Sequence, residues 1–121
     1  MSAPLWAAVA LLGGCGAIAR FLLDGWVGER TRGSFPLGTL AVNLSGAFAL
    51  GLLTGLALRG DALLLAGTAT LGSYTTFSTW MLESQRLAED AQLRLAALNV
   101  ALSLAAGLGA SALGRVLGAH L

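Results

Sequence analysis

The sequence has little of what a water-soluble protein, a disulfide-bonded protein or a metalloenzyme needs. It contains no lysine, one cysteine (Cys15) and one histidine (His120), and only 11% of its 121 residues are charged, whereas a soluble domain has about 25%. One cysteine excludes a disulfide framework and a multi-cysteine metal site. One histidine disfavours a His-based catalytic centre or zinc site. A net charge of +1 excludes a basic face that binds nucleic acid.

What is present is largely apolar, with 56% hydrophobic residues and a mean hydropathy of +0.79. The charged residues leave four uncharged stretches, which are residues 1–19, 33–58, 62–82 and 95–114. A helix needs about 20 apolar residues to cross the bilayer core, and a charge at its centre costs about 2.5–3.5 kcal/mol. The spacing therefore predicts an all-α integral membrane protein with one transmembrane domain over residues 1–121. Its four transmembrane helices are expected near residues 4–23, 38–58, 62–82 and 94–114.

The connections between these helices are short, so any chemistry is expected inside the membrane. The longest runs from residue 24 to residue 36 and contains three glycines and a proline as turn formers. Residues 83–94 hold three acids and two arginines and are expected to continue as helix beyond the membrane. No basic residue precedes Arg20, which disfavours a signal peptide, and Cys15 is expected to be a small buried residue of the first helix.

The positive charges are too evenly divided to fix one orientation in the membrane. Arg59 and Arg115 lie on the side of the two termini, against four arginines on the opposite side and Arg20 at its edge. The positive-inside rule depends on such counts, and this margin is small. Two outcomes stay open at this point: one preferred orientation, or insertion both ways with antiparallel pairing of two copies.

Small and polar residues recur every four positions on two of the predicted helices. The stripes are Asn43, Ala47, Gly51 and Gly55 on the second helix, and Asn99, Ser103, Gly107 and Ser111 on the fourth. The small residues predict close helix packing. The two asparagines and Ser103 must face protein or water, because a polar side chain in hydrocarbon needs a partner. They are candidates either for hydrogen bonds between helices or for the lining of a polar pathway.

The third predicted helix contains the most informative segment, GSYTTFSTW at residues 72–80, with five Ser or Thr hydroxyls in mid-membrane. Glycine and threonine are poor helix formers, and hydroxyls can bond to backbone carbonyls in place of helical amides. We expect a break near residues 72–79, or else a kinked helix stabilised by these hydroxyls. A break would free carbonyl oxygens for a cation and amides for an anion.

Three segments resemble motifs of one family. They are GGCGAIAR at 13–20, FPLGTLAVNLSGAF at 35–48 and GSYTTFST at 72–79. They resemble the patterns GGxxGAxxR, FPxGTLxVNxxGxF and GGxTTFST of the Fluc/CrcB family of fluoride channels, with Glu83 at the expected later acid. The resemblance extends over nearly the whole chain. Three motifs in the order of the family, on four predicted membrane crossings of the right length, make this resemblance highly specific.

The resemblance implies an antiparallel, dual-topology homodimer with two anion pores. Backbone carbonyls at Gly72 and Thr75 would bind one structural sodium ion between the subunits. The rings of Phe77 and Trp80 would line each pore, and Arg20 would lie near the vestibule. The other residues expected along the anion route are Asn43, Thr39, Thr76, Ser78 and Thr79, and Ser103 on the fourth helix.

The chain departs from the family pattern at Ser73 and Ala69, where glycine is common, and at Trp80 and Asn99. Many members have phenylalanine where Trp80 stands, and a tyrosine is expected where Asn99 stands. An indole keeps a positive ring edge and adds an N–H donor, so contact with an anion would survive. The chemistry of the ion agrees with the resemblance. Fluoride binds its water tightly, so a selective pore must replace that water with close neutral donors and ring edges.

The sequence thus predicts a passive, fluoride-selective channel that exports fluoride across the cell (inner) membrane and so confers fluoride resistance. Its expected partners are a second copy, the fluoride ion and the lipid bilayer. The alternative is a small proton-coupled multidrug-type exporter with four helices. That function needs a membrane-embedded carboxylate, and the nearest acids, Asp24 and Glu83, lie at the ends of spans. A membrane scaffold would not need the hydroxyl-rich segment, and an enzyme is not expected without a nucleophile–base pair or metal-ligand cluster.

Overall fold

The computed structural model describes all 121 residues and contains helices but no strand. Three helices are long and apolar enough to cross a membrane: α1 (Ala3–Arg30), α2 (Leu37–Gly55) and α6 (Leu93–Ala119). Four shorter elements lie between α2 and α6. They are α3 (Gly60–Leu63), η1 (Leu64–Leu71), α4 (Gly72–Tyr74) and α5 (Ser78–Glu89). The predicted all-α class is confirmed.

The first helix is longer than the sequence indicated. It was expected to end near residue 23, but α1 continues to Arg30 and includes Gly25 and Gly28. Glycine weakens a helix only modestly, and a membrane helix satisfies its own backbone groups. The helix ends where the Thr31 amide and hydroxyl both donate to the Val27 carbonyl. Cys15, expected to be buried, is exposed on this helix.

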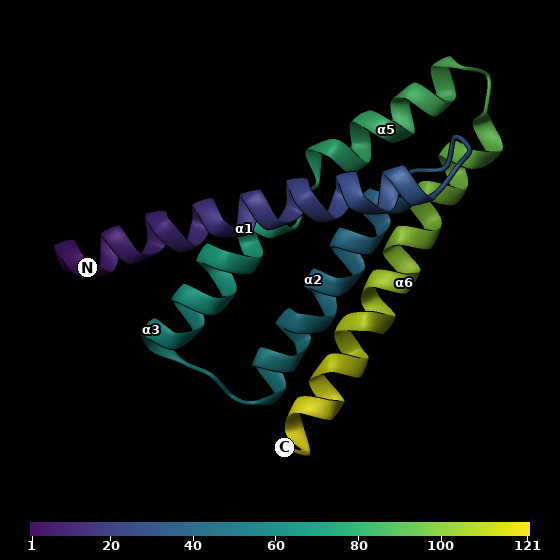
Figure 1. The fold of residues 1–121 in the computed structure, drawn as a ribbon. Coiled ribbons are helices and arrows are strands. Elements are labelled where there is room, and N and C mark those ends of the chain that lie inside the picture. Colours follow the sequence, from purple (N-terminus) through teal and green to yellow (C-terminus); the bar gives the residue numbers. More distant parts are fainter.

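Helices α2 and α6 lie side by side along most of their length (Figure 1). Their contact depends on glycine, because an added Cβ at Gly51 would collide with the Ser111 backbone, and one at Gly114 would collide with the Phe48 backbone. Small residues allow such close approach of two helices in lipid. The stripe expected on α2 therefore packs as predicted, whereas Gly107 of the α6 stripe has no neighbour within 4 Å of an added Cβ.

The third predicted crossing is a series of short helices rather than one continuous helix. The turns of η1 are wide, as shown where the Gly72 amide donates to the Gly67 carbonyl, five residues back. Helix α1 crosses this segment (Figure 1) at Gly16, which packs on the Thr70 backbone. The helix then stops after Tyr74 and resumes at Ser78. The break lies within the predicted range 72–79.

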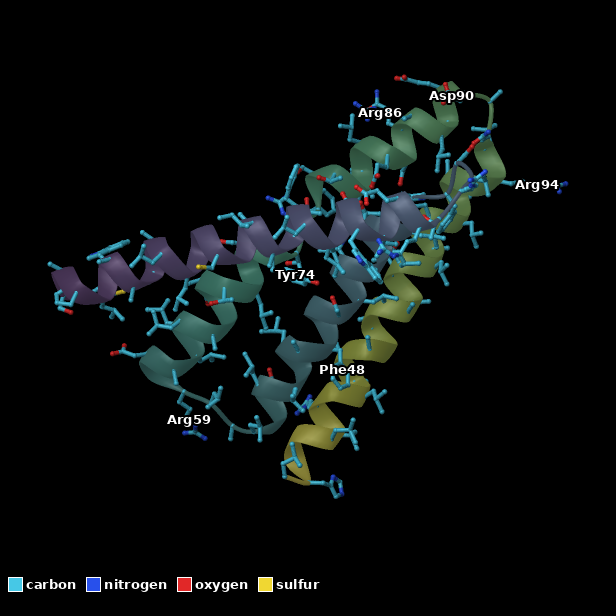
Figure 2. The ribbon with its side chains drawn as sticks, viewed as in Figure 1. Phe48, Arg59, Tyr74, Arg86, Asp90 and Arg94 are labelled. Carbon is cyan, nitrogen blue, oxygen red and sulfur yellow. The ribbon has the colours of Figure 1, made fainter.

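A single copy of the chain has almost no core of its own. Only 13 of 121 residues are buried, and the largest fully buried side chains are Val42 and Asn99. Charged residues gather at the ends of the helices, with Arg86, Asp90 and Arg94 at one end and Arg59 at the other (Figure 2). Apolar side chains such as Phe21 and Leu108 stay exposed along the helices between these ends. This distribution is that of a multi-pass membrane protein.

Candidate anion pathway

The break in the third crossing is bonded to one side chain of α2. Asn43 Nδ2 donates to the Thr76 carbonyl oxygen at 2.8 Å, and the Thr76 amide donates to Asn43 Oδ1 at 2.8 Å. A carboxamide carries the same kinds of donor and acceptor as a peptide group, so Asn43 satisfies two backbone groups that the break frees. The Nδ2 group has two hydrogens, and the second remains for another acceptor.

Two threonine hydroxyls satisfy further backbone groups beside the break. Thr75 Oγ1 donates to the Leu71 carbonyl at 3.1 Å, in the last turn before the break. Thr76 Oγ1 accepts from the Thr79 amide at 3.2 Å, in the first turn of α5. The Leu71 carbonyl also accepts from the Thr75 amide at 3.0 Å, so only the Thr76 hydroxyl replaces a helical backbone bond. The hydroxyl-rich sequence therefore has a structural role at the break.

The break also leaves backbone groups without a partner inside the chain. The Thr75 carbonyl accepts no hydrogen bond, and the Phe77 amide donates none. In a continuous helix the Thr76 amide would bond to the Gly72 carbonyl, but here it bonds to Asn43. Exposed carbonyl oxygens can bind a cation and free amides can bind an anion.

A groove of about 550 Å³ opens at the break, between α2, η1 and α6. Most of the residues predicted for the ion sites meet in it. They are Asn43, Gly72, Thr75, Thr76, Phe77, Trp80 and Ser103. Aliphatic side chains such as Leu50 and Leu104 complete the lining. The groove thus combines an apolar wall with a few neutral polar groups.

The two predicted pore aromatics contact each other at one edge of this groove. The rings of Phe77 and Trp80 are edge-to-face, with centroids 5.6 Å apart and planes at 85°. Phe77 is 70% exposed in the single chain. The Trp80 indole N–H was expected to be a further donor for an anion, but it donates to the Asn99 carbonyl at 3.1 Å. The indole N–H is therefore already bonded within the chain and is not free for an anion.

A smaller cavity of about 190 Å³ lies on the other side of the break. Four of the predicted residues line it, namely Arg20, Thr39, Thr76 and Thr79. Two of their polar atoms, Arg20 Nε and Thr39 Oγ1, are buried without a hydrogen-bond partner. Thr39 is only 2% exposed. Unpaired buried polar groups are rare in proteins and call for a ligand or water, so this cavity is a candidate site for a small polar ligand, with the Asp24 carboxylate also in its lining.

Comparison with known proteins agrees with this geometry. The family model for the CrcB-like protein, Camphor Resistance (CrcB), matches residues 7–115. The chain belongs to the CrcB family. It is 57% identical over 113 residues, 93% of each chain, to "Fluoride-specific ion channel FluC 2" of Mycolicibacterium paratuberculosis. It is 52% identical over 115 residues to the protein of that name from Mycobacterium tuberculosis, covering 95% of this chain and 91% of the relative.

A more distant relative covers the same length of the chain. "Fluoride-specific ion channel FluC 1" of Symbiobacterium thermophilum is 42% identical over 119 residues, covering 93% of this chain and 96% of its own. The predicted family resemblance is therefore confirmed.

Within this CrcB chain, Thr76 lines both the groove and the smaller cavity, and so lies at their junction. Of the predicted site residues, Ser78 is exposed and lines neither of them. The roles of these residues toward an ion stay predictions.

Three polar residues of this CrcB chain have contacts that sequence reasoning missed. Asp24 lines the smaller cavity beside Arg20 and packs on Gly38. Tyr74 shares a hydrogen bond of 2.7 Å with Ser45, which joins α4 to α2. Motif spacing alone does not show such contacts, because each joins residues far apart in the chain.

Glu83 follows the predicted third span and lines a cavity of about 390 Å³ with Asp24, Arg86 and Asp90. Burial raises the pKa of the Glu83 carboxyl and the nearby Thr39 hydroxyl lowers it, while the Asp24 carboxylate raises it and the charge of Arg86 lowers it. A raised pKa favours the neutral form of a carboxyl.

Proposed function

We propose that this protein is a passive, fluoride-selective channel that exports fluoride across the cell (inner) membrane. The names of its CrcB relatives support fluoride as the ion. The lining of the groove supports an anion, because its polar groups are neutral, and the one positive charge, that of Arg20, lies in the smaller cavity. A strong positive site would trap an anion, whereas several weak sites let it leave.

The single observation that carries the proposal is the set of unused donors around Thr76. One N–H of Asn43 and the Phe77 amide lie on the groove side, and Thr39 Oγ1 and Arg20 Nε lie in the smaller cavity. Because Thr76 lines both spaces, an anion that passes this residue meets donors before and after it. Fluoride needs such close donors in place of its water.

The groove is open on one side, and we propose that a second copy closes it. Phe77 is 70% exposed beside a groove of about 550 Å³, and few residues are buried in one copy. With the weak arginine bias, the second copy would insert in the opposite orientation and form an antiparallel homodimer. Two-fold symmetry would then repeat every site, which gives two pores.

We also propose that one structural sodium ion binds between the two copies. The candidate ligands are the backbone carbonyls of Gly72 and Thr75. The Thr75 carbonyl has no hydrogen bond, and the Gly72 carbonyl has lost the Thr76 amide as its helical donor. Neutral carbonyl oxygens at an unwound segment suit Na⁺, so the residues present fit the ion. Its charge would fix the two breaks against each other.

A liposome flux measurement tests the proposed function. Purified protein is reconstituted in liposomes loaded with potassium fluoride, and a fluoride electrode follows release after a potassium ionophore is added. The proposal predicts rapid release that stops when the ionophore is left out, because charge then accumulates. Equally fast release of chloride, or release that needs a proton gradient, would contradict it and favour an unselective pore or a proton-coupled exporter.

A further inference from the structure

A buried hydrogen-bond network joins α5 to α6 directly behind the aromatic pair. Asn99 Nδ2 donates to Ser84 Oγ at 2.8 Å and makes a longer contact of 3.5 Å to the Trp80 carbonyl. Ser84 Oγ donates to the same Trp80 carbonyl at 2.9 Å. In return, Trp80 Nε1 donates to the backbone carbonyl of Asn99 at 3.1 Å. Asn99 and Ser84 thereby bond to both the backbone and the indole of Trp80.

This network is separate from the groove itself. Asn99 is 1% exposed and Ser84 is 8% exposed, and neither lines the groove that Phe77 and Trp80 line. Both hydrogens of Asn99 Nδ2 are directed at Ser84 and Trp80, so none remains for an ion. The sequence left two roles open for Asn99, which were hydrogen bonds between helices and the lining of a polar pathway. Its contacts favour the first.

The network extends to the groove through the indole ring. The edge-to-face contact of Trp80 with Phe77, at 5.6 Å and 85°, fixes the direction in which the Phe77 edge points. An aromatic ring attracts an anion only at its positive edge and repels it at its face. The angle of the Phe77 ring therefore decides whether this ring attracts or repels the ion.

We propose that Asn99 and Ser84 are positioning residues for conduction, which fix the Trp80 indole and, through it, the orientation of the Phe77 ring. The proposal rests on the proposed channel function. Its physical basis is that a buried side-chain amide without a hydrogen-bond partner costs free energy. The bond between the Asn99 side chain and Ser84 therefore keeps α5 and α6 in the register that brings Trp80 Nε1 to the backbone carbonyl of Asn99. If that register is lost, the indole N–H must find another acceptor, and the large ring moves into the groove.

A spectroscopic experiment tests the positioning without measuring flux. The other two tryptophans, Trp6 and Trp26, are 59% and 53% exposed on α1 and are replaced by phenylalanine, so that Trp80 is the sole reporter. Fluorescence anisotropy decay then measures the motion of its indole. Asn99→Leu and the smaller change Ser84→Ala should both increase this motion. Ser111→Ala, on the same helix as Asn99, is the matched control and should not.

A double-mutant cycle tests whether the positioning matters for conduction. Asn99→Leu should reduce fluoride flux on the order of tenfold, the change that about 1.4 kcal/mol in the barrier to ion passage would produce. In a Trp80→Phe background the same change should cost less than about twofold, because phenylalanine has no N–H whose bond to the residue 99 backbone carbonyl depends on the register of α5 and α6. A purely structural role would instead lower flux equally in both backgrounds.

The outcomes separate this inference from the channel function. Equal losses in both backgrounds, or an indole whose motion is unchanged in both Asn99→Leu and Ser84→Ala, would overturn the positioning role. If Asn99→Leu does not fold, Ser84→Ala replaces it in both measurements. A parent protein that passes no fluoride would contradict the channel function, while the anisotropy measurement would still report whether the network fixes Trp80.

Discussion

Asn43 and Thr76, 33 residues apart in the chain, exchange two hydrogen bonds of 2.8 Å at the centre of the broken crossing. The Asn43 carboxamide takes the place of a peptide group and satisfies both the amide and the carbonyl of Thr76. A non-helical segment survives at membrane depth only where its polar groups are satisfied by protein or water. One side chain of α2 therefore makes the break possible and presents its remaining N–H to the groove.

Replacing Asn43 with leucine, which has a similar shape, should cost both stability and conduction. The change leaves the amide and carbonyl of Thr76 without hydrogen-bond partners. Each unsatisfied buried group lowers the free energy of unfolding by about 1–3 kcal/mol. We expect a lower thermal midpoint in detergent and fluoride flux reduced at least roughly tenfold. Thr54→Val is the matched control on the same helix, since the Thr54 hydroxyl bonds only to the Leu50 carbonyl. An Asn43→Leu protein that melts and conducts like the parent would show that the break does not need this residue.

Phe77→Ile should sharply reduce fluoride flux while the dimer still forms. Isoleucine keeps much of the bulk of the side chain but has no positive ring edge to attract the anion. Flux from liposomes and gel filtration in detergent measure the two properties. Should the variant conduct like the parent with the dimer intact, the ring serves packing and the anion route lies elsewhere.

Trp80→Phe should keep most of the flux, because it restores the residue that is commoner in the family. Tryptophan near the end of a span is also typical of the aromatic belt at the membrane surface. In that role Trp80 would face lipid, and its loss would lower stability without altering selectivity. Measuring the thermal midpoint together with the fluoride-to-chloride flux ratio distinguishes the two roles.

Much of the fold could be predicted from the sequence because charge spacing is a strong constraint in lipid. The positions of the spans and the break near residues 72–79 depend on local properties, namely uncharged runs and a cluster of hydroxyls. The end of α1 could not be predicted in the same way. Gly25 and Gly28 are turn formers in water, but in α1 the helix continues past them to Arg30, which packs on Trp26 at 4.1 Å.

The sequence motifs named residues that the fold brings together at the groove, but they did not show how these residues contact one another. The motif placed Asn43 and Thr76 among the pore residues, yet only the fold shows that they bond to each other. Asn99 illustrates the same limit. Its place on a polar stripe of α6 allowed two roles, and the choice depends on Ser84 and Trp80, which α5 brings to it from 15 and 19 residues away.

Gly114→Ala should destabilise the contact between α2 and α6. The added methyl group would collide with the Phe48 carbonyl, and overpacking of this kind costs about 1–3 kcal/mol. Gly109→Ala is the matched control on the same helix, because nothing lies within 4 Å of its added Cβ. We expect the thermal midpoint to fall for Gly114→Ala only. Equal thermal midpoints for the two variants would mean that α2 and α6 do not approach each other closely at Gly114.

Both orientations of the chain should occur in one membrane, since the arginine bias is weak. Cys15 is replaced by alanine, and a single cysteine is placed at Ser34, which is exposed in the connection between α1 and α2. A membrane-impermeant thiol reagent should then label about half of the copies from each side, as two-fold antiparallel pairing requires. Labelling of all copies from one side only would contradict the antiparallel dimer.

The reversal potential across a planar bilayer tests the central claim most directly. With the protein in the bilayer, a tenfold fluoride gradient and equal chloride on both sides, a passive fluoride-selective channel should reverse near the fluoride equilibrium potential. That potential is roughly 59 mV for a monovalent ion, and it should not move when a pH gradient is added. A reversal potential near zero would show that chloride passes as well, and one that follows the pH gradient would show proton coupling. Either result would contradict the account.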